Sequence, residues 1–103
     1  METPVRTKEK LLSLISSNRN RILGYGVKTL GVFGSFVRNQ QNEKSDIDLL
    51  VDFVPEKETY RNFISLAYYL EDLLGRRVEV VTRNGLSPYI GPRILKEVEN
   101  VPL

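Results

Sequence analysis

The chain has 103 residues, 41% hydrophobic and 27% charged, a size and composition that suit one small globular domain with a single modest core. It contains no cysteine and no histidine, which excludes disulfides, thiolate and imidazole metal ligands, and a histidine base. Its net charge of +2 is too small to indicate a nucleic-acid partner, and the sequence lacks both a membrane-spanning apolar run of about 18 residues and the apolar core of a signal peptide.

A helix and then a strand are predicted for the first third of the chain. Thr7 is a good N-cap residue, and the apolar residues that recur after it at helical spacing predict a helix over residues 7–18. The glycines on either side of Tyr25 predict a turn over residues 24–26. The apolar run that follows predicts the first strand, residues 27–33.

Gly34 and Ser35 come directly after this strand. A tight turn that runs into a helical turn, here expected over residues 35–39, offers backbone N–H groups and a hydroxyl to a phosphate oxygen. Arg38 has two interpretations at this stage. It either contacts a triphosphate, because a guanidinium suits phosphate geometry, or it is an exposed helix charge.

Two carboxylates open the second predicted strand, residues 47–53. Alternation places its apolar residues on one face and Asp46 and Asp48 on the other. Carboxylates two residues apart on a strand lie about 7 Å apart at the backbone, so both can reach one metal ion or a pair of ions. Only oxygen ligands are available, which favours Mg²⁺ or Mn²⁺. Alternatively the two are solvated residues at the start of a strand. Ser45 is expected to cap or position them.

A long helix and a third strand follow. The apolar stripe over residues 60–74 predicts a helix that packs on the core, and residues 78–82 alternate as a short strand. Glu79 then lies on the face opposite Val78 and Val80. If this strand lies beside the second one, Glu79 joins the aspartate pair; otherwise it is a surface glutamate on a half-exposed strand.

The last twenty residues predict a loop and a final helix. The loop, residues 84–92, holds two prolines and two glycines. Its apolar residues Leu86, Tyr89 and Ile90 form either a lip that binds a partner or a segment that folds back on the core, and we expect the latter. Pro92 suits the first turn of a helix predicted over residues 92–100.

These elements predict an α/β domain with a small mixed sheet built from residues 27–33, 47–53 and 78–82. The helices should pack on the face that carries Ile47, and the face that carries Asp48 should be an open cleft.

A family resemblance rests on the turn and the carboxylate pair. Gly34-Ser35, ten intervening residues and Asp46-x-Asp48 resemble the signature of the DNA polymerase β-like nucleotidyltransferases. The flanking residues 33–38 and 45–51 are similar to those of the minimal nucleotidyltransferases, which are often paired as antitoxins with a HEPN-type ribonuclease toxin. The resemblance covers residues 28–100.

Two residues depart from the family pattern. The family usually has glycine where this chain has Asn39, the next most tolerant residue type for a left-handed backbone, so the turn should survive. The third strand of the family usually carries an aspartate, whereas this chain has the longer Glu79. This second departure puts full activity in doubt.

The resemblance implies the polymerase β-like nucleotidyltransferase fold and an adenylyltransferase. Two Mg²⁺ ions, with Mn²⁺ as an alternative, would bind the predicted catalytic carboxylates Asp46, Asp48 and Glu79. ATP would be held by the predicted nucleotide-binding residues Gly34, Ser35, Arg38 and Ser45. AMP would pass to a hydroxyl of a HEPN-type toxin, with a tyrosine as acceptor and Glu79 assisting its deprotonation. We expect a cytoplasmic domain over residues 1–103 that forms a hetero-oligomer with the toxin, without direct nucleic-acid or membrane binding.

Other functions remain open. An alternative is an antitoxin with a weak or inactive site that neutralises its toxin by binding alone. Glu79 in place of the family's usual aspartate favours this alternative. A nucleic-acid-binding accessory domain is disfavoured by 15 basic against 13 acidic residues without an aromatic-basic strand. An antibiotic-modifying enzyme is disfavoured by the missing second domain.

Overall fold

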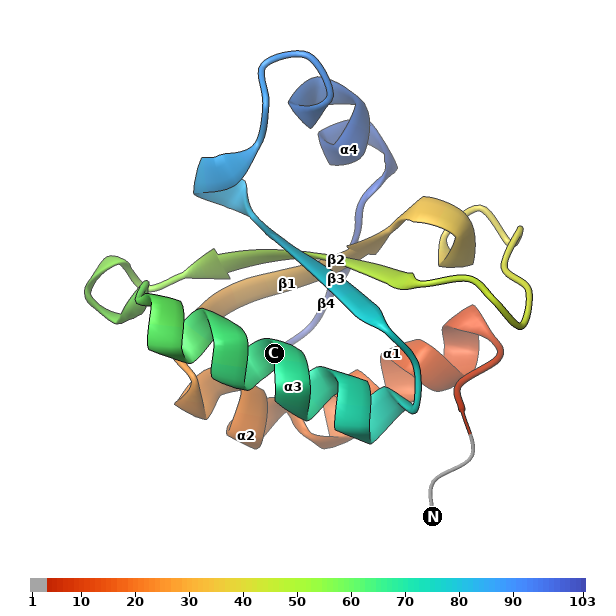
Figure 1. Ribbon diagram of the computed structural model, residues 1–103, viewed down its shortest axis with the longest axis horizontal. Helices are drawn as coiled ribbons and strands as arrows, with labels where there is room; N and C mark the ends of the chain where they lie inside the picture. The colour runs from red at the N-terminus through yellow and green to blue at the C-terminus, as the bar shows by residue number, and fades with distance from the viewer. Residues whose placement is uncertain (1–3) are drawn as a thin grey trace.

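A four-stranded mixed sheet with the order β3-β2-β1-β4 forms the centre of the protein (Figure 1). The structure is a computed structural model and describes residues 4–103. Its helices and strands are α1 Lys8–Ser17, α2 Arg19–Gly24, β1 Val27–Phe33, β2 Ile47–Phe53, α3 Tyr60–Leu74, β3 Val78–Thr82, α4 Gly91–Glu97 and β4 Glu99–Val101. The α/β class and the mixed sheet predicted from the sequence are confirmed.

The sheet contains one parallel strand pair. β1 is antiparallel to β2 and to β4, whereas β2 and β3 are parallel. A parallel pair requires a crossover connection, and α3 supplies it between β2 and β3. Because of this crossover, β2 and β3 both begin at the same end of the sheet. There the Ile47 N–H donates to the carbonyl of Arg77 at 3.0 Å.

Capping residues fix the ends of the helices, and the N-cap predicted at Thr7 is confirmed. The Thr7 hydroxyl accepts the Lys10 N–H at 3.1 Å at the start of α1. Thr59 caps α3 in the same way, and Gly75 ends α3 in a left-handed conformation with φ of 68°. The predicted first helix is followed at once by the short α2, because Asn18 closes α1 and begins α2.

The core lies between the sheet and α1, α2 and α3, which cover one face (Figure 1). On this face β2 contributes Ile47, Leu49 and Val51, all fully buried. The predicted stripe of α3 packs against them through Leu66, Leu70 and Leu74, also fully buried. Burial of one such side chain contributes about 1.5–3 kcal/mol. The other face of β2 is therefore left for Asp48.

The segment after β3 lies on the opposite side of the sheet from the three core helices (Figure 1). The cleft predicted on this face is therefore not open across its whole width, because α4 stands over part of it. The prediction that Tyr89 and Ile90 pack on the core is wrong: 92% of Tyr89 and 55% of Ile90 are exposed. Leu86 is half-buried.

The C-terminus forms a strand that sequence reasoning missed. The helix predicted to Asn100 ends at Glu97, and β4 pairs with β1 in the register Val32 to Glu99. Val101 precedes Pro102, which disfavours a helical backbone there, and the free edge of β1 satisfies the backbone of β4. Within residues 4–103, no helix is long and apolar enough to cross a membrane.

Candidate active site

Strand register brings two of the predicted carboxylates side by side. Asp48 of β2 pairs with Glu79 of the parallel β3 and with Phe33 of the antiparallel β1. The two side chains lie close enough to share a proton in a hydrogen bond. Asp46, one residue before β2, is exposed at the edge of the sheet. Glu79 is exposed on the partly buried strand β3, and the strand register places it beside Asp48, as the first of its two interpretations required.

Asp48 has a strongly shifted pKa. Its burial, the hydrogen bond to Glu79, and the negative charges of Glu79 and Asp46 raise the pKa of Asp48 from 3.8 to about 6, while Arg38 opposes the shift. Asp48 therefore holds a proton more readily than an isolated aspartate does. A bound cation would relieve the same repulsion.

The donor set fits Mg²⁺ or Mn²⁺ better than a metal that needs nitrogen or sulfur. In the described part of the chain, no three acidic side chains are grouped closely enough to hold one ion by themselves. Mg²⁺ is usually bound by one or two carboxylates together with substrate phosphates and water. The Asp48–Glu79 pair with Asp46 beside it suits that kind of site, in which the nucleotide completes the ligand set.

Gly34 lies against the Asp48 carboxylate. It begins a 3₁₀ turn, Gly34–Phe36, with φ of 79°. A Cβ atom on residue 34 would lie 2.1 Å from Asp48 Oδ2, which no side chain tolerates. Glycine is thus required twice at this position, by its backbone conformation and by the nearby carboxylate. The glycine of the sequence motif and its second aspartate form one structural unit.

The turn also presents Ser35 as predicted. The N–H groups of Val37 and Arg38 both donate to the Gly34 carbonyl, at 3.1 and 3.2 Å. Asn39 adopts a left-handed backbone with φ of 59°, so the turn survives the replacement of the usual glycine. Ser35, half-buried, follows Gly34 in this turn.

Glu97 is a site residue that sequence reasoning missed. One carboxylate oxygen of Glu97 accepts the Gly34 N–H at 2.8 Å, and the other accepts Arg38 Nη1 at 2.5 Å. Burial raises the pKa of Glu97, but the hydrogen bonds from Gly34 and Arg38 and the charges of Arg38 and Arg93 outweigh it and hold that pKa below its usual value. The partners are 59 and 63 positions away in the sequence, so no local pattern indicated them.

Arg38 is exposed, as one of its two predicted interpretations has it, and its contact with a triphosphate stays a prediction. Arg38 is tied to Glu97, and its Nε donates to Gln40 Oε1 at 3.1 Å.

A cleft separates the carboxylate face of the sheet from α4. Its charged end, about 250 Å³, is lined by Phe33, Gly34, Arg38, Asp48, Ile90, Arg93, Ile94 and Glu97. Its apolar end, about 290 Å³, lies beside Glu79 and is lined by Phe33, Glu79, Val81, Gly85, Leu86, Ser87, Ile90 and Ile94. The two ends share Phe33, Ile90 and Ile94. Polar groups at one end and an apolar wall at the other are typical of a small-molecule site.

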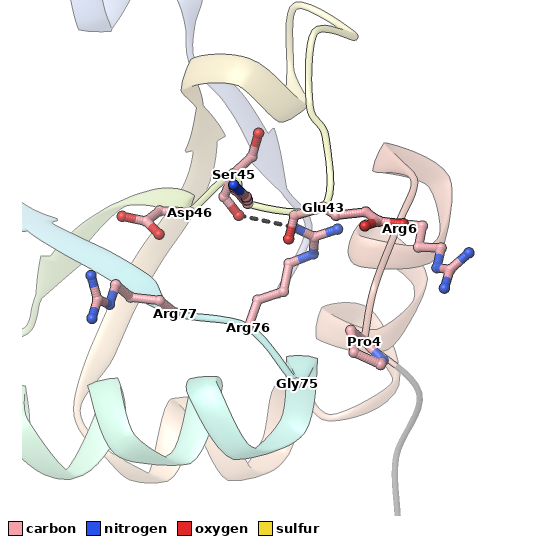
Figure 2. A pocket seen from close by; sticks show the side chains of 9 residues that line it. Pro4, Arg6, Glu43, Ser45, Asp46, Gly75, Arg76 and Arg77 are labelled. Atoms are coloured by element: carbon pink, nitrogen blue, oxygen red, sulfur yellow. Dashed lines mark hydrogen bonds between the residues drawn. The ribbon is translucent and has the colours of Figure 1, made fainter.

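A second hollow, about 550 Å³, lies on the other side of Asp46 and is drawn in Figure 2. Arg76 organises it: Nη1 donates to the carbonyls of Ser45 and Asn42, both at 2.9 Å, and the guanidinium lies over the Phe36 ring at 5.2 Å. The Ser45 hydroxyl accepts the Asn42 N–H at 2.8 Å. Ser45 therefore helps to close the loop that leads into Asp46, which agrees with a positioning role.

Comparisons with known proteins agree with this site. Residues 9–100 match the nucleotidyltransferase domain family. The chain is 41% identical over 93 residues to the protein adenylyltransferase MntA of Thermococcus cleftensis, an alignment that covers 89% of this chain and 93% of that protein.

Two solved structures share the fold. One, assigned as a minimal nucleotidyltransferase, is 35% identical with a TM-score of 0.81 and covers 95% of this chain and 97% of its own. The other, from a complex of a tri-AMPylated HEPN toxin of Shewanella oneidensis with its MNT antitoxin, is 18% identical with a TM-score of 0.58 and covers 84% of this chain and 71% of its own. The chain is a nucleotidyltransferase and belongs, within the nucleotidyltransferase domain family, to the minimal nucleotidyltransferases.

Proposed function

We propose that the protein is an antitoxin that transfers AMP from ATP, with Mg²⁺ or Mn²⁺, to a tyrosine hydroxyl of a cognate HEPN-type ribonuclease toxin in the cytoplasm. The observation that carries the proposal is the Asp48–Glu79 pair, which faces the cleft next to the Gly34 turn. The name of the Thermococcus relative and the AMPylated toxin bound by the Shewanella neighbour support AMP as the transferred group and a HEPN protein as the acceptor.

In this proposal the carboxylates Asp46, Asp48 and Glu79 hold the metal ions. Bound there, the ions would neutralise the charge that develops on the triphosphate. Ser35, presented by the Gly34 turn, binds and orients a phosphate group so that the acceptor oxygen faces the α-phosphorus in line with the leaving pyrophosphate. The P–O bond to the acceptor forms as the bond to pyrophosphate breaks.

Glu79 is the proposed base. It lies beside Asp48 and also lines the apolar end of the cleft, where a phenol ring can approach. It accepts the proton that leaves the acceptor hydroxyl. In this proposal the acceptor hydroxyl belongs to another macromolecule and reaches the site from the surface.

The direct test is incubation of the protein with ATP, Mg²⁺ and the purified candidate toxin, followed by mass spectrometry of the toxin. We expect a mass increase by whole AMP units on a tyrosine, and no increase with Asp48→Asn. Asp52→Asn is the matched control, because Asp52 lies further along the same strand and outside the cleft lining. An unmodified toxin with the wild-type protein contradicts the proposal.

A second candidate function is neutralisation by binding alone. The observations that favour it are Glu79 in place of the usual aspartate and the lack, among residues 4–103, of a preformed three-carboxylate metal cage. A double variant, Asp46→Ala with Asp48→Ala, separates the two functions. Full protection against the toxin by this variant supports binding alone.

A further inference from the structure

We propose that Glu97 is a positioning residue for the phosphate-binding turn and that Arg38 acts through Glu97 rather than through direct contact with the nucleotide. This inference deepens the proposed function and rests on it, because it concerns how the same site recognises ATP. It also assigns a role to α4 and β4, the part of the chain with the weakest sequence pattern.

The Glu97 carboxylate joins two parts of the turn. One of its oxygens accepts the Gly34 N–H, and the other accepts Arg38 Nη1. Gly34 is buried, and its N–H has the Glu97 carboxylate as its acceptor, so loss of Glu97 removes the protein partner of this N–H. Arg38 follows four residues later, after the 3₁₀ turn. The two contacts therefore hold both ends of the segment that carries Ser35.

Glu97 is itself fixed by its backbone neighbours. It is the last residue of α4, and the next N–H, that of Val98, donates to the Ile94 carbonyl at 2.8 Å. Glu99 then pairs with Val32 of β1, two residues before Gly34. The pairing of β4 with β1 therefore fixes the Glu97 backbone next to the strand that leads into the turn. The Glu97 carboxylate has a defined position before any nucleotide binds.

The same geometry couples the turn to the carboxylate pair. A Cβ on residue 34 would lie 2.1 Å from Asp48 Oδ2, so the Gly34 backbone lies directly against this carboxylate on the side of β2. If the acceptor on its other side is lost, the backbone of Gly34 is free to move away from β2. Ser35 and the Gly34 backbone beside Asp48 would then both lose their defined positions.

Two of the five N–H groups of Arg38 are already engaged within the protein. Its Nη1 is bound to Glu97 and its Nε to Gln40, and the negative charge of Glu97 compensates its positive charge. The nucleotide-binding role predicted for Arg38 is therefore better explained as a contact that holds the turn through Glu97.

The test measures ATP affinity with Mg²⁺ by isothermal titration, at a temperature well below the unfolding transition of each variant. Glu97→Ala should weaken ATP binding by about tenfold, within the range seen when residues that orient a site are removed. Glu97→Gln keeps an acceptor of the same shape and should recover part of the loss, which also covers the case in which Glu97→Ala does not fold. Glu99→Gln is the control, because it breaks the ion pair with Lys8 at 3.1 Å on the same segment and should leave the affinity unchanged.

Double variants identify the role of Arg38. If it acts through Glu97, Arg38→Gln with Glu97→Ala should bind ATP no more weakly than the worse single variant. Additive losses show that Arg38 contacts the nucleotide and overturn the inference. An unchanged affinity of Glu97→Ala overturns it as well, and a tighter affinity, which would mean that the carboxylate competes with a phosphate, also overturns it. Wild-type protein that does not bind ATP contradicts the proposed function itself, which distinguishes that failure from a failure of this inference alone.

Discussion

The Asp48 carboxylate lies so close to Gly34 that a Cβ atom on residue 34 would be 2.1 Å from Oδ2. The two residues are separated by thirteen others in the sequence, and the pairing of Phe33 with Asp48 across β1 and β2 brings them together. The glycine that starts the turn after β1 is therefore also one wall of the carboxylate site.

Gly34→Ala should damage the site and the fold together. Its positive φ and the contact with Asp48 both oppose a side chain, and strain of this kind costs about 1–3 kcal/mol of unfolding free energy. We expect weaker ATP binding by titration and a lower denaturant midpoint. Gly24→Ala is the matched control, because a Cβ atom added to Gly24 would have no neighbouring atom within 4 Å and should not reduce stability. Equal stability of both variants contradicts the explanation.

The raised pKa of Asp48 predicts how stability depends on pH. A carboxyl with a pKa of about 6 in the folded protein and 3.8 unfolded favours folding most fully below pH 3.8, and this contribution is lost as the pH rises to 6. Asp48→Asn removes the charge, so at pH 8 it should unfold at a higher temperature than the wild type. At pH 4 the difference should be small. Asp52→Asn, further along the same strand and outside the cleft lining, serves as the control in the same thermal scans.

The raised pKa of Asp48 also predicts that nucleotide binding weakens at low pH. Protonated Asp48 is a poor ligand for a divalent cation, so Mg²⁺-dependent ATP binding should weaken as the pH falls through about 6. Titrations at a series of pH values measure this directly. An affinity that is constant between pH 5 and 8 speaks against Asp48 as a metal ligand.

Glu79→Gln should separate binding from chemistry. The amide keeps the size of the side chain beside Asp48 but cannot accept a proton, and loss of a general base costs about a hundredfold or more in turnover. We expect ATP affinity to change much less than the transfer rate. Equal losses in affinity and rate would instead assign Glu79 to metal binding alone.

Arg93 is expected to contribute to nucleotide affinity. It lines the charged end of the cleft, and among residues 4–103 it takes part in neither of the two ion pairs, which are Lys8–Glu99 and Arg38–Glu97. Arg93→Ala should weaken ATP binding, and the loss should shrink at high salt. Lys96→Ala, on the same helix but outside the cleft lining, should bind ATP like the wild type.

The sequence predicted the parts of the fold that have a strong local pattern. Apolar and polar residues alternate along β2, α3 carries a long apolar stripe, and the Thr7 cap of α1 is a local interaction. The bounds of these elements therefore follow from neighbouring residues. The position of Glu79 beside Asp48 also followed from alternation once the two strands were taken as neighbours.

What the sequence did not predict depends on contacts between distant residues. β4 has only three residues and is stabilised by the free edge of β1. Glu97 is an ordinary glutamate near a helix end until the fold brings it to Gly34. Tyr89 and Ile90 are apolar but exposed, because the segment before α4 stands away from the core helices.

Isothermal titration of ATP into the wild type and into the double variant Asp46→Ala, Asp48→Ala, each with and without Mg²⁺, tests the central claim most directly. The claim is that the carboxylates beside the Gly34 turn form a metal-dependent nucleotide site. It predicts binding by the wild type that requires Mg²⁺ and is lost in the double variant. Equal ATP affinity in both proteins, or wild-type binding that does not depend on Mg²⁺, would contradict it.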